Sequence, residues 1–291
     1  MHPDANRPDT HDDLSVTKKC VTFGLPLISR RVAKNWPMVN KLLANTLRSV
    51  FNQTTDAIQV IIACHEPPDI IEVKDPRVSI VQVPFDIPRF QWEQEVDRMR
   101  KLETIGVHHR SRGGGWLFIL DSDDFVSEDL ASRILASSDK ALVVATGYKL
   151  DAARMEVQKM RRFWRKCGSS CAINWAIEEL PECFPQDNPP IYHRFAETRH
   201  IVQPELFTSL QWTFSYIEAP TVTYLINHGQ NQSDIISALS LKWRLYFMLA
   251  RRKQWDETFA AKFGVTTAAV TDAIYRGDAL FATQRIGAAS D

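Results

Sequence analysis

Residues 116–130, WLFILDSDDFVSEDL, join an apolar run directly to a cluster of acidic side chains. The run at 116–120 predicts a buried strand, and three of the next four residues are Asp121, Asp123 and Asp124. In extended backbone, side chains two residues apart point the same way, so Asp121 and Asp123 can face one target while Asp124 faces another. Adjacent carboxylates in a partly dry cleft repel each other unless a cation lies between them. We therefore expect Asp121 and Asp123 to hold Mg²⁺ or Mn²⁺ beneath a diphosphate.

A simpler interpretation is that the aspartates end the strand and cap the helix that follows. Ser127 is the predicted N-cap of that helix, and Glu128 and Asp129 fall in its first turn, where the helix dipole favours anions. Because the helix has its own cap in Ser127, capping alone explains three aspartates poorly. Both interpretations stay open.

Strands and helices alternate on either side of this stretch. Further strands are predicted at 20–28, 58–64, 78–85 and 141–148. Apolar residues at helical spacing predict helices between them, one from Val39 to Phe51 and one from Trp92 to Ile105. This order predicts an α/β fold with a mostly parallel sheet flanked by helices. Such sheets bind ligands at the carboxyl ends of their strands, which is where 121–124 would lie.

Composition excludes some classes of protein. The 291 residues contain 35 Lys and Arg and 35 Asp and Glu, so no global charge favours nucleic acid, and we expect none as a partner. The first 19 residues are polar and lack a secretory pattern, and no run of 18 apolar residues occurs, so we expect a cytoplasmic protein with a disordered tail at 1–19. The five cysteines form no CxxC pair, which favours reduced thiols over a disulfide framework or structural zinc.

Two basic, aromatic stretches lie in the second half, at 154–166 and 239–253. The second has its apolar residues on one stripe and predicts a helix packed on the domain with a basic back. Alternatively, both stretches hold the protein peripherally at the inner face of an anionic membrane.

The quoted stretch and its surroundings resemble family 2 glycosyltransferases, which have the GT-A fold. The resemblance rests on the order of elements and on PLISR (26–30), TLRSVFNQT (46–54), VIIAC (60–64) and FILDSDD (118–124). It covers 20–150 well and the rest weakly. It implies a GT-A-like catalytic domain at 20–236, with a nucleotide-sugar half at 20–150 and an acceptor half at 151–236, followed by a C-terminal helical segment at 237–291.

The resemblance also implies which residues contact a nucleoside diphosphate sugar. Asp121 and Asp123 occupy the family's Asp-X-Asp position, with Ser122 between them, and other donor contacts are implied at Pro26, Ser29, Glu66, Asp86, Arg98 and Lys101. For the two basic residues, a solvated helix face is the alternative. The family usually ends its second strand with an aspartate that reads the base. This chain has CHEPP (64–68), so Glu66 or His65 must substitute and the identity of the base stays open.

An inverting transferase needs a carboxylate that deprotonates the acceptor hydroxyl, and the family carries it several dozen residues beyond the metal motif. We favour Glu197, in the charge-rich HRFAETRH (193–200), followed by Glu178 and Glu179. The remaining candidates are Asp187 and Glu205. His228 follows a predicted strand and is a candidate metal ligand or diphosphate contact, with a loop-stabilising histidine as the alternative. Trp175 is either part of an acceptor wall or part of the core.

The sequence thus predicts metal-dependent transfer of a hexose from a nucleoside diphosphate sugar, most simply a UDP-sugar, to a saccharide or lipid-linked acceptor. Inversion is expected from the resemblance alone. One alternative is a non-catalytic nucleotide-sugar-binding protein of the same fold. Another is a haloacid-dehalogenase-type phosphatase, although its Asp-X-Asp normally lies on the first strand. The sequence leaves the sugar, the acceptor and the oligomeric state open.

Overall fold

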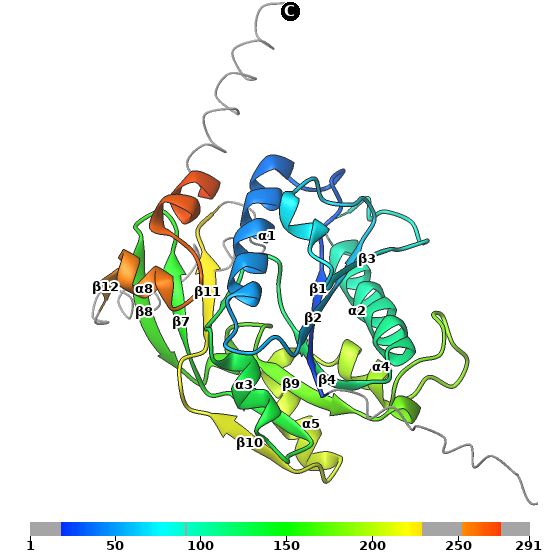
Figure 1. Cartoon of the computed structure of the whole chain (residues 1–291). Helices are drawn as coiled ribbons and strands as arrows, with labels where there is room; N and C mark the ends of the chain where they lie inside the picture. Colours follow the sequence, from blue (N-terminus) through cyan, green and yellow to red (C-terminus); the bar gives the residue numbers. More distant parts are fainter. Residues whose placement is uncertain (1–18, 91, 229–251, 275–291) are drawn as a thin grey trace, which may run out of the picture.

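The computed structural model describes residues 19–90, 92–228 and 252–274, which form two β-sheets flanked by helices (Figure 1). In spatial order, the first sheet consists of β10 (Phe214–Ile217), β6 (Ala141–Val144), β9 (Cys171–Trp175), β4 (Gly115–Ile119), β1 (Val21–Pro26), β2 (Ile58–Cys64) and β3 (Val78–Gln82). The strands from β4 to β3 are parallel, as is the β10–β6 pair, whereas β9 runs antiparallel to both of its neighbours. The expected parallel sheet is therefore confirmed for β1 to β4 and interrupted at β9.

Two long helices cover this sheet. Helix α1 (Trp36–Phe51) begins at Asn35, whose side chain accepts a hydrogen bond from the amide of Met38. One stripe of α1, including Val39 and Leu43, packs on β1 and β2. Helix α2 (Glu93–Ser111) packs through Leu102 and Ile105 in a second apolar cluster that includes Ile61. The shorter helices are α3 (Leu130–Leu135), α4 (Ile191–Glu197) and α5 (Gln203–Ser209), with 3-10 turns η1 (Ile71–Lys74), η2 (Phe163–Arg165), η3 (Ile177–Glu179) and η4 (His200–Val202).

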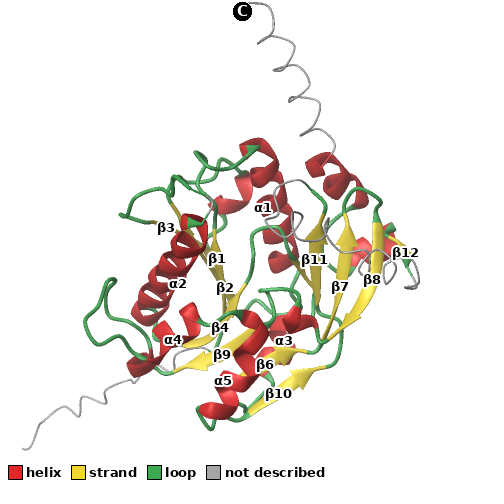
Figure 2. Ribbon diagram, turned by 180° about the vertical axis from the view of Figure 1, so that it is seen from behind, coloured by secondary structure: helices red, strands yellow, loops and turns green. Residues whose placement is uncertain are grey.

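The second sheet is mostly antiparallel and lies on the other side of α1 (Figures 1 and 2). Its order is β12 (Lys253–Gln254), β8 (Glu156–Arg161), β7 (Thr146–Asp151), β11 (Val222–Ile226) and β5 (Phe125–Val126), and only β7 and β11 run parallel. The expectation of one strand over 141–148 is wrong, because the chain leaves the first sheet after Val144 and joins the second at Thr146. Gly147 is needed there, since a Cβ would lie 2.4 Å from the ring of Phe163.

The acidic stretch joins the two sheets. It follows β4 of the first sheet and runs into β5, which pairs with β11 of the second. The predicted N-cap at Ser127 is wrong, because pairing of β5 delays the helix until Leu130. The Ser127 hydroxyl instead donates to Asp129 at 2.6 Å.

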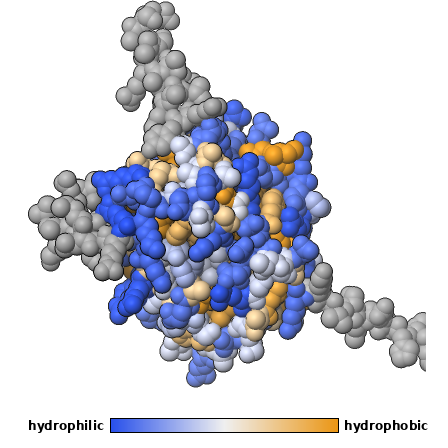
Figure 3. Space-filling view, turned by 60° about the vertical axis from the view of Figure 1, so that its left-hand side comes forward, coloured by the Kyte–Doolittle hydropathy of each residue, from blue (hydrophilic) through white to orange (hydrophobic). Residues whose placement is uncertain are grey.

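The described part of the C-terminal segment packs onto α1. Trp255 and Phe263 form an apolar cluster with Met38 and Leu42, through β12, α8 (Glu257–Ala261) and a helix at 267–274. The helix predicted over 239–253 lies almost entirely outside the described residues, as does nearly all of the tail at 1–19. None of the described helices is both long and apolar enough to cross a bilayer. The face in Figure 3 is mostly hydrophilic, with apolar residues in separate small areas.

Candidate functional site

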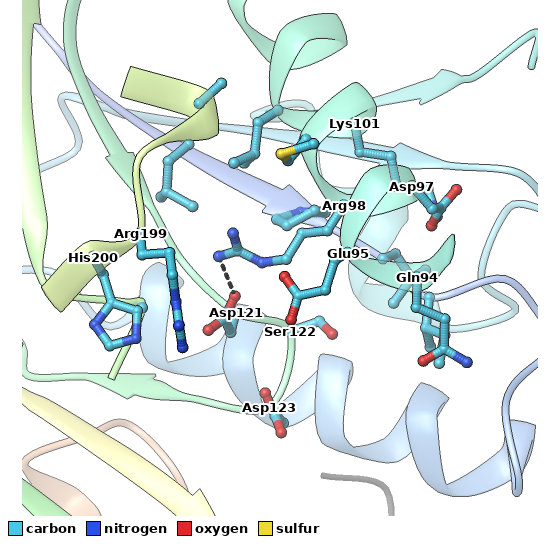
Figure 4. Close-up of a pocket in the computed structure, with 18 of the residues that line it drawn as sticks. Gln94, Glu95, Asp97, Arg98, Lys101, Asp121, Ser122, Asp123, Arg199 and His200 are labelled. Carbon is cyan, nitrogen blue, oxygen red and sulfur yellow. Dashed lines mark hydrogen bonds and ion pairs between the residues drawn. The ribbon is translucent and has the colours of Figure 1, made fainter. Parts of the chain in front are cut away.

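A cavity of about 500 Å³ opens at the carboxyl ends of β1 and β4. Its walls come from the end of β1, from α2, from 121–123, from 166–168, from 195–200 and from Tyr224 and His228. In Figure 4, Arg98 and Glu95 lie on one side of Asp121, and Arg199 and His200 lie on the other. Segments far apart in the sequence thus meet around the aspartates, at the sheet edge that the α/β pattern predicts.

Asp121 forms an ion pair with Arg98, whose Nη2 lies 3.0 Å from Oδ1 (Figure 4). The other oxygen, Oδ2, lies against Gly168, where a Cβ would be 2.9 Å away. The backbone amide of Asp121 donates to Ser169 Oγ at 2.9 Å. The 168–169 segment therefore fixes the position of this carboxylate within the cavity.

Asp124 faces the opposite way, into the protein. Its Oδ2 accepts hydrogen bonds from Ser169 at 2.6 Å and Cys167 at 3.1 Å, and its Oδ1 accepts one from the amide of Leu225 at 3.3 Å. Burial, reinforced by the charges of Asp123 and Asp121, raises the pKa of Asp124 well above its usual range. Asp124 thus ties the acidic stretch to 167–169 and to β11, and does not face the cavity.

Asp123 is paired with His228. The Nε2 of His228 lies 2.8 Å from Oδ2 of Asp123, and the imidazole is almost completely buried. Within the described part of the chain, the other ring nitrogen, Nδ1, has no hydrogen-bond partner. This contact brings His228 to the acidic stretch, and its expected role as a metal ligand or diphosphate contact stays a prediction.

The carboxylates offer hard oxygen ligands, yet they do not converge as a metal cage. Among the described residues, no three His, Cys, Asp or Glu side chains are arranged to hold an ion. Mg²⁺ sites in phosphate-binding proteins commonly use only one or two carboxylates, with water and phosphate oxygens completing the shell. Asp121, Asp123 and His228 therefore do not form a permanent metal site made by the described residues alone, and an ion here would need further ligands from water or phosphate.

The other predicted donor residues divide into two groups. Pro26, Arg98, Lys101 and Ser122 line the cavity. Ser29, Glu66 and Asp86 do not line it. Ser29 donates to Glu66 at 3.1 Å between the ends of β1 and β2, and Asp86 is exposed beyond β3.

Lys101 lies in a buried polar cluster. Its Nζ donates to Asp97 at 2.5 Å, and the second oxygen of Asp97 lies 2.6 Å from Nε2 of His65. Burial lowers the pKa of Lys101, and the charge of Asp97 partly opposes this shift. The alternative that Lys101 belongs to a solvated helix face is therefore wrong.

Of the predicted bases, only Glu197 lines the cavity. Its Oε1 lies 3.1 Å from Nε2 of His193, whose Nδ1 is 2.6 Å from the buried Glu103. The carboxyl of Glu103 has its pKa raised by burial, and the contact with His193 acts in the opposite direction.

The structure brings neither Glu178 nor Glu179 to the cavity. Because β9 runs antiparallel, its last residue, Trp175, pairs with Gly115 at the start of β4. The residues of η3 therefore lie near the amino end of β4, whereas the aspartates follow its carboxyl end. Glu179 forms an ion pair with Lys140. The remaining base candidates, Asp187 and Glu205, are exposed and do not line the cavity.

Trp175 is part of the core. Its ring packs against those of Tyr192 and Phe195 at 5.0 and 5.6 Å, and it is 2% exposed. The acceptor-wall interpretation of Trp175 is therefore wrong.

Several cavity residues escaped the sequence analysis, among them Glu95, Lys166, Gly168 and Tyr224. Glu95 could have been found, because it precedes Arg98 by three residues on α2 and so shares its face. Lys166 ends the basic stretch 154–166, but nothing in that pattern shows that Lys166 and Gly168 reach the aspartates, because this depends on the order of the strands.

No family model matches the chain, and no curated protein matches it. Two solved structures are similar to it in part. A nucleotidyl transferase from Methanothermobacter thermautotrophicus aligns at 10% identity and a TM-score of 0.34, covering 69% of this chain and 88% of that one. A protein from Desulfovibrio desulfuricans G20 that carries the name nucleotide-diphospho-sugar transferase aligns at 10% identity and a TM-score of 0.35, covering 84% and 98%.

Proposed function

We propose that the chain is a metal-dependent glycosyltransferase that moves a hexose from a nucleoside diphosphate sugar, foremost a UDP-sugar, to a saccharide or lipid-linked acceptor. One observation carries the proposal: Asp121 and Asp123 lie at the carboxyl edge of the sheet in a cavity of about 500 Å³ that also contains Arg98 and His228. The cavity contains both acidic and basic side chains. Carboxylates can bind a divalent ion and basic groups can bind a diphosphate, so this mixture suits a ligand that combines the two.

Asp121, Asp123 and His228 are the residues that would hold the ion on the diphosphate. A divalent ion bound there would neutralise the negative charge that develops on the leaving diphosphate. Arg98 is 3.0 Å from Asp121, and its guanidinium can turn to a phosphate oxygen when the ligand is bound. Arg199 and His200, on the opposite wall, add cationic or hydrogen-bonding capacity.

Glu197 is the proposed base. It accepts the proton of the acceptor hydroxyl as that oxygen forms a bond to the anomeric carbon, while the bond from this carbon to the diphosphate oxygen breaks. A single displacement of this kind inverts the anomeric configuration. His193, held by Glu103, lies 3.1 Å from Glu197 and orients its carboxylate.

A second candidate is a nucleotide-sugar-binding protein without catalysis. It is favoured by the pairing of both motif carboxylates, Asp121 with Arg98 and Asp123 with His228. In that case the donor would bind without metal and without turnover. The phosphatase alternative is disfavoured because the Asp-X-Asp follows β4, whereas β1 ends in Pro26.

Thermal unfolding with a panel of UDP-, GDP- and dTDP-sugars, with and without Mn²⁺, tests the proposal. We expect the sugar nucleotides of one of these three nucleotides to raise the Tm, and to do so only with Mn²⁺. Asp123→Asn should remain folded but lose that shift in Tm. Asp69→Asn, at an exposed position outside the cavity, is the matched control and should respond like the wild type. Release of nucleoside diphosphate with acceptor distinguishes the transferase from the binding protein, and hydrolysis of an aryl phosphate would identify a phosphatase. If Asp123→Asn showed the same metal-dependent shift in Tm as the wild type, Asp123 would not be part of the donor site.

A further inference from the structure

A second cavity, of about 510 Å³, lies where the chain passes from β6 to β7, beside strand β10 at the edge of the first sheet. It is lined by three cations (Lys159, Arg161 and Arg162), two aromatic residues (Trp164 and Tyr216), one acid (Glu218) and the backbone turn at 145–146. None of these residues belongs to the cavity that contains Asp121.

Within the described residues, none of the three cations, Lys159, Arg161 and Arg162, forms an ion pair, although Glu218 borders the same cavity. Lys159 and Arg161 are two residues apart on β8 and so project from the same face. Arg162 follows with φ of 51°, in the left-handed region that residues other than glycine adopt rarely. The chain therefore brings three like charges to the wall of one cavity.

An aromatic wall completes the cavity. The rings of Trp164 and Tyr216 pack with centroids 5.2 Å apart and planes tilted by 39°. Tyr216 is 43% exposed, so part of its ring is open to a ligand in the cavity. Aromatic rings beside these cations are suited to a ligand that has an apolar ring face and a negative charge.

We infer that this second cavity binds an anionic saccharide, one that carries carboxylate or phosphate groups. Arg161, Arg162 and Lys159 would hold the anion, and a sugar ring would lie against Trp164. Glu218 would accept a hydrogen bond from a sugar hydroxyl.

A membrane surface fits this cavity less well. The cations surround a hollow, whereas a bilayer contact needs a projecting surface with apolar side chains that enter the lipid. The apolar side chains of 157–164 do not project in this way: Val157 and Phe163 are buried, and Met160 and Trp164 are half-buried.

The two cavities share one segment of chain. Nδ1 of His200, which lines the first cavity, donates to the carbonyl of Trp164, and Lys166 lines the first cavity two residues further on. An extended anionic acceptor could therefore reach from one cavity to the other. That role rests on the proposed function, whereas binding in the second cavity does not.

Isothermal titration without donor or metal tests the inference. The probes are trigalacturonic acid and glucose 6-phosphate, with maltotriose as the neutral comparison. We expect at least one anionic probe to bind about 10-fold or more tightly than maltotriose. Arg161→Gln/Arg162→Gln should weaken that binding about 10-fold or more, the effect of losing one or two charge-assisted hydrogen bonds. Circular dichroism verifies that the variant is folded.

Lys74→Gln/Lys262→Gln, which removes two exposed charges outside the cavity, is the matched control and should bind like the wild type. Asp123→Asn should also bind like the wild type, so failure of the donor proposal would leave this result unchanged. Three results would overturn the inference: no binding of either anionic probe, equal loss in the lysine control, or arginine-dependent binding to phosphatidylserine vesicles without saccharide binding.

Discussion

Replacing Gly168 by alanine perturbs the cavity at one defined point. The new Cβ would lie 2.9 Å from Oδ2 of Asp121 and 3.2 Å from Nη2 of Arg98. Carbon and oxygen atoms that are not bonded rarely approach closer than about 3.4 Å, so the Asp121 carboxylate must shift by roughly 0.5 Å. Gly168 does not have a positive φ, so alanine adds no backbone strain.

The two groups nearest to the new Cβ, the Asp121 carboxylate and the Arg98 guanidinium, are ends of side chains that line a cavity, so they have room to move. We therefore expect a loss of at most about 1 kcal/mol in the free energy of unfolding, or a fall in Tm of less than about 4 °C. A displaced Asp121 carboxylate would contact the ion and Arg98 less well, and weakening one such charged interaction by about 1.4 kcal/mol lowers donor affinity roughly 10-fold.

The assay is titration calorimetry with the nucleotide-sugar that stabilises the wild type, in the presence of Mn²⁺. Asp121→Asn and the double variant with Gly168→Ala complete a double-mutant cycle. If alanine acts by displacing Asp121, the double variant should bind no more weakly than Asp121→Asn alone. Fully additive losses, or unchanged affinity in Gly168→Ala, would refute the role given to this glycine.

Three further predictions concern single positions. Burial lowers the pKa of His109 from 6.5 to about 4, so the unfolded chain takes up its proton first and stability falls as pH drops from 6.5 through 4. At 1.36 kcal/mol per pH unit, the neutral His109 lowers the free energy of unfolding by about 3 kcal/mol across that window. In urea unfolding at pH 7 and pH 4.5, the free energy of unfolding should therefore decrease less in His109→Gln than in the wild type. Asp124→Ala should lower the free energy of unfolding by about 2 kcal/mol or more, because Ser169 and its other partners lose their acceptor, whereas Asp124→Asn should stay within about 1 kcal/mol in the same assay. Glu197→Gln should lower kcat by about 100-fold or more while donor affinity in calorimetry changes less than about 2-fold, and an unchanged kcat would exclude Glu197 as the base.

The sequence predicted well those features that depend on local pattern. The apolar run at 58–64 is β2 from its first residue to its last, and α1 buries the stripe that contains Val39 and Leu43. The positions of Asp121 and Asp123 at the cavity also follow from a local pattern, because an acidic stretch after a parallel strand must lie at that edge of the sheet.

The features that were missed depend on pairing between distant segments. The apolar run at 141–148 gives no sign that the chain changes sheets at Ala145, because both halves are buried strands. Ser127 has the chemistry of an N-cap, but the pairing of β5 with β11 uses the residues before it. Glu178 and Glu179 were misplaced for a related reason. The number of residues between them and Asp123 does not reveal the direction of β9. Because β9 runs antiparallel to β4, Glu178 and Glu179 lie at the opposite end of the sheet from the aspartates.

Electron paramagnetic resonance of Mn²⁺ is the most direct test of a diphosphate-dependent metal site at the acidic stretch. Free Mn²⁺ gives a signal that is lost on binding, so a titration with and without UDP counts the ions held by the chain. We predict that one Mn²⁺ is bound per chain when UDP is present, that binding is at least about 10-fold weaker without UDP, and that Asp123→Asn abolishes the difference. Equal Mn²⁺ binding with and without UDP, or an unchanged titration of Asp123→Asn, would contradict the account.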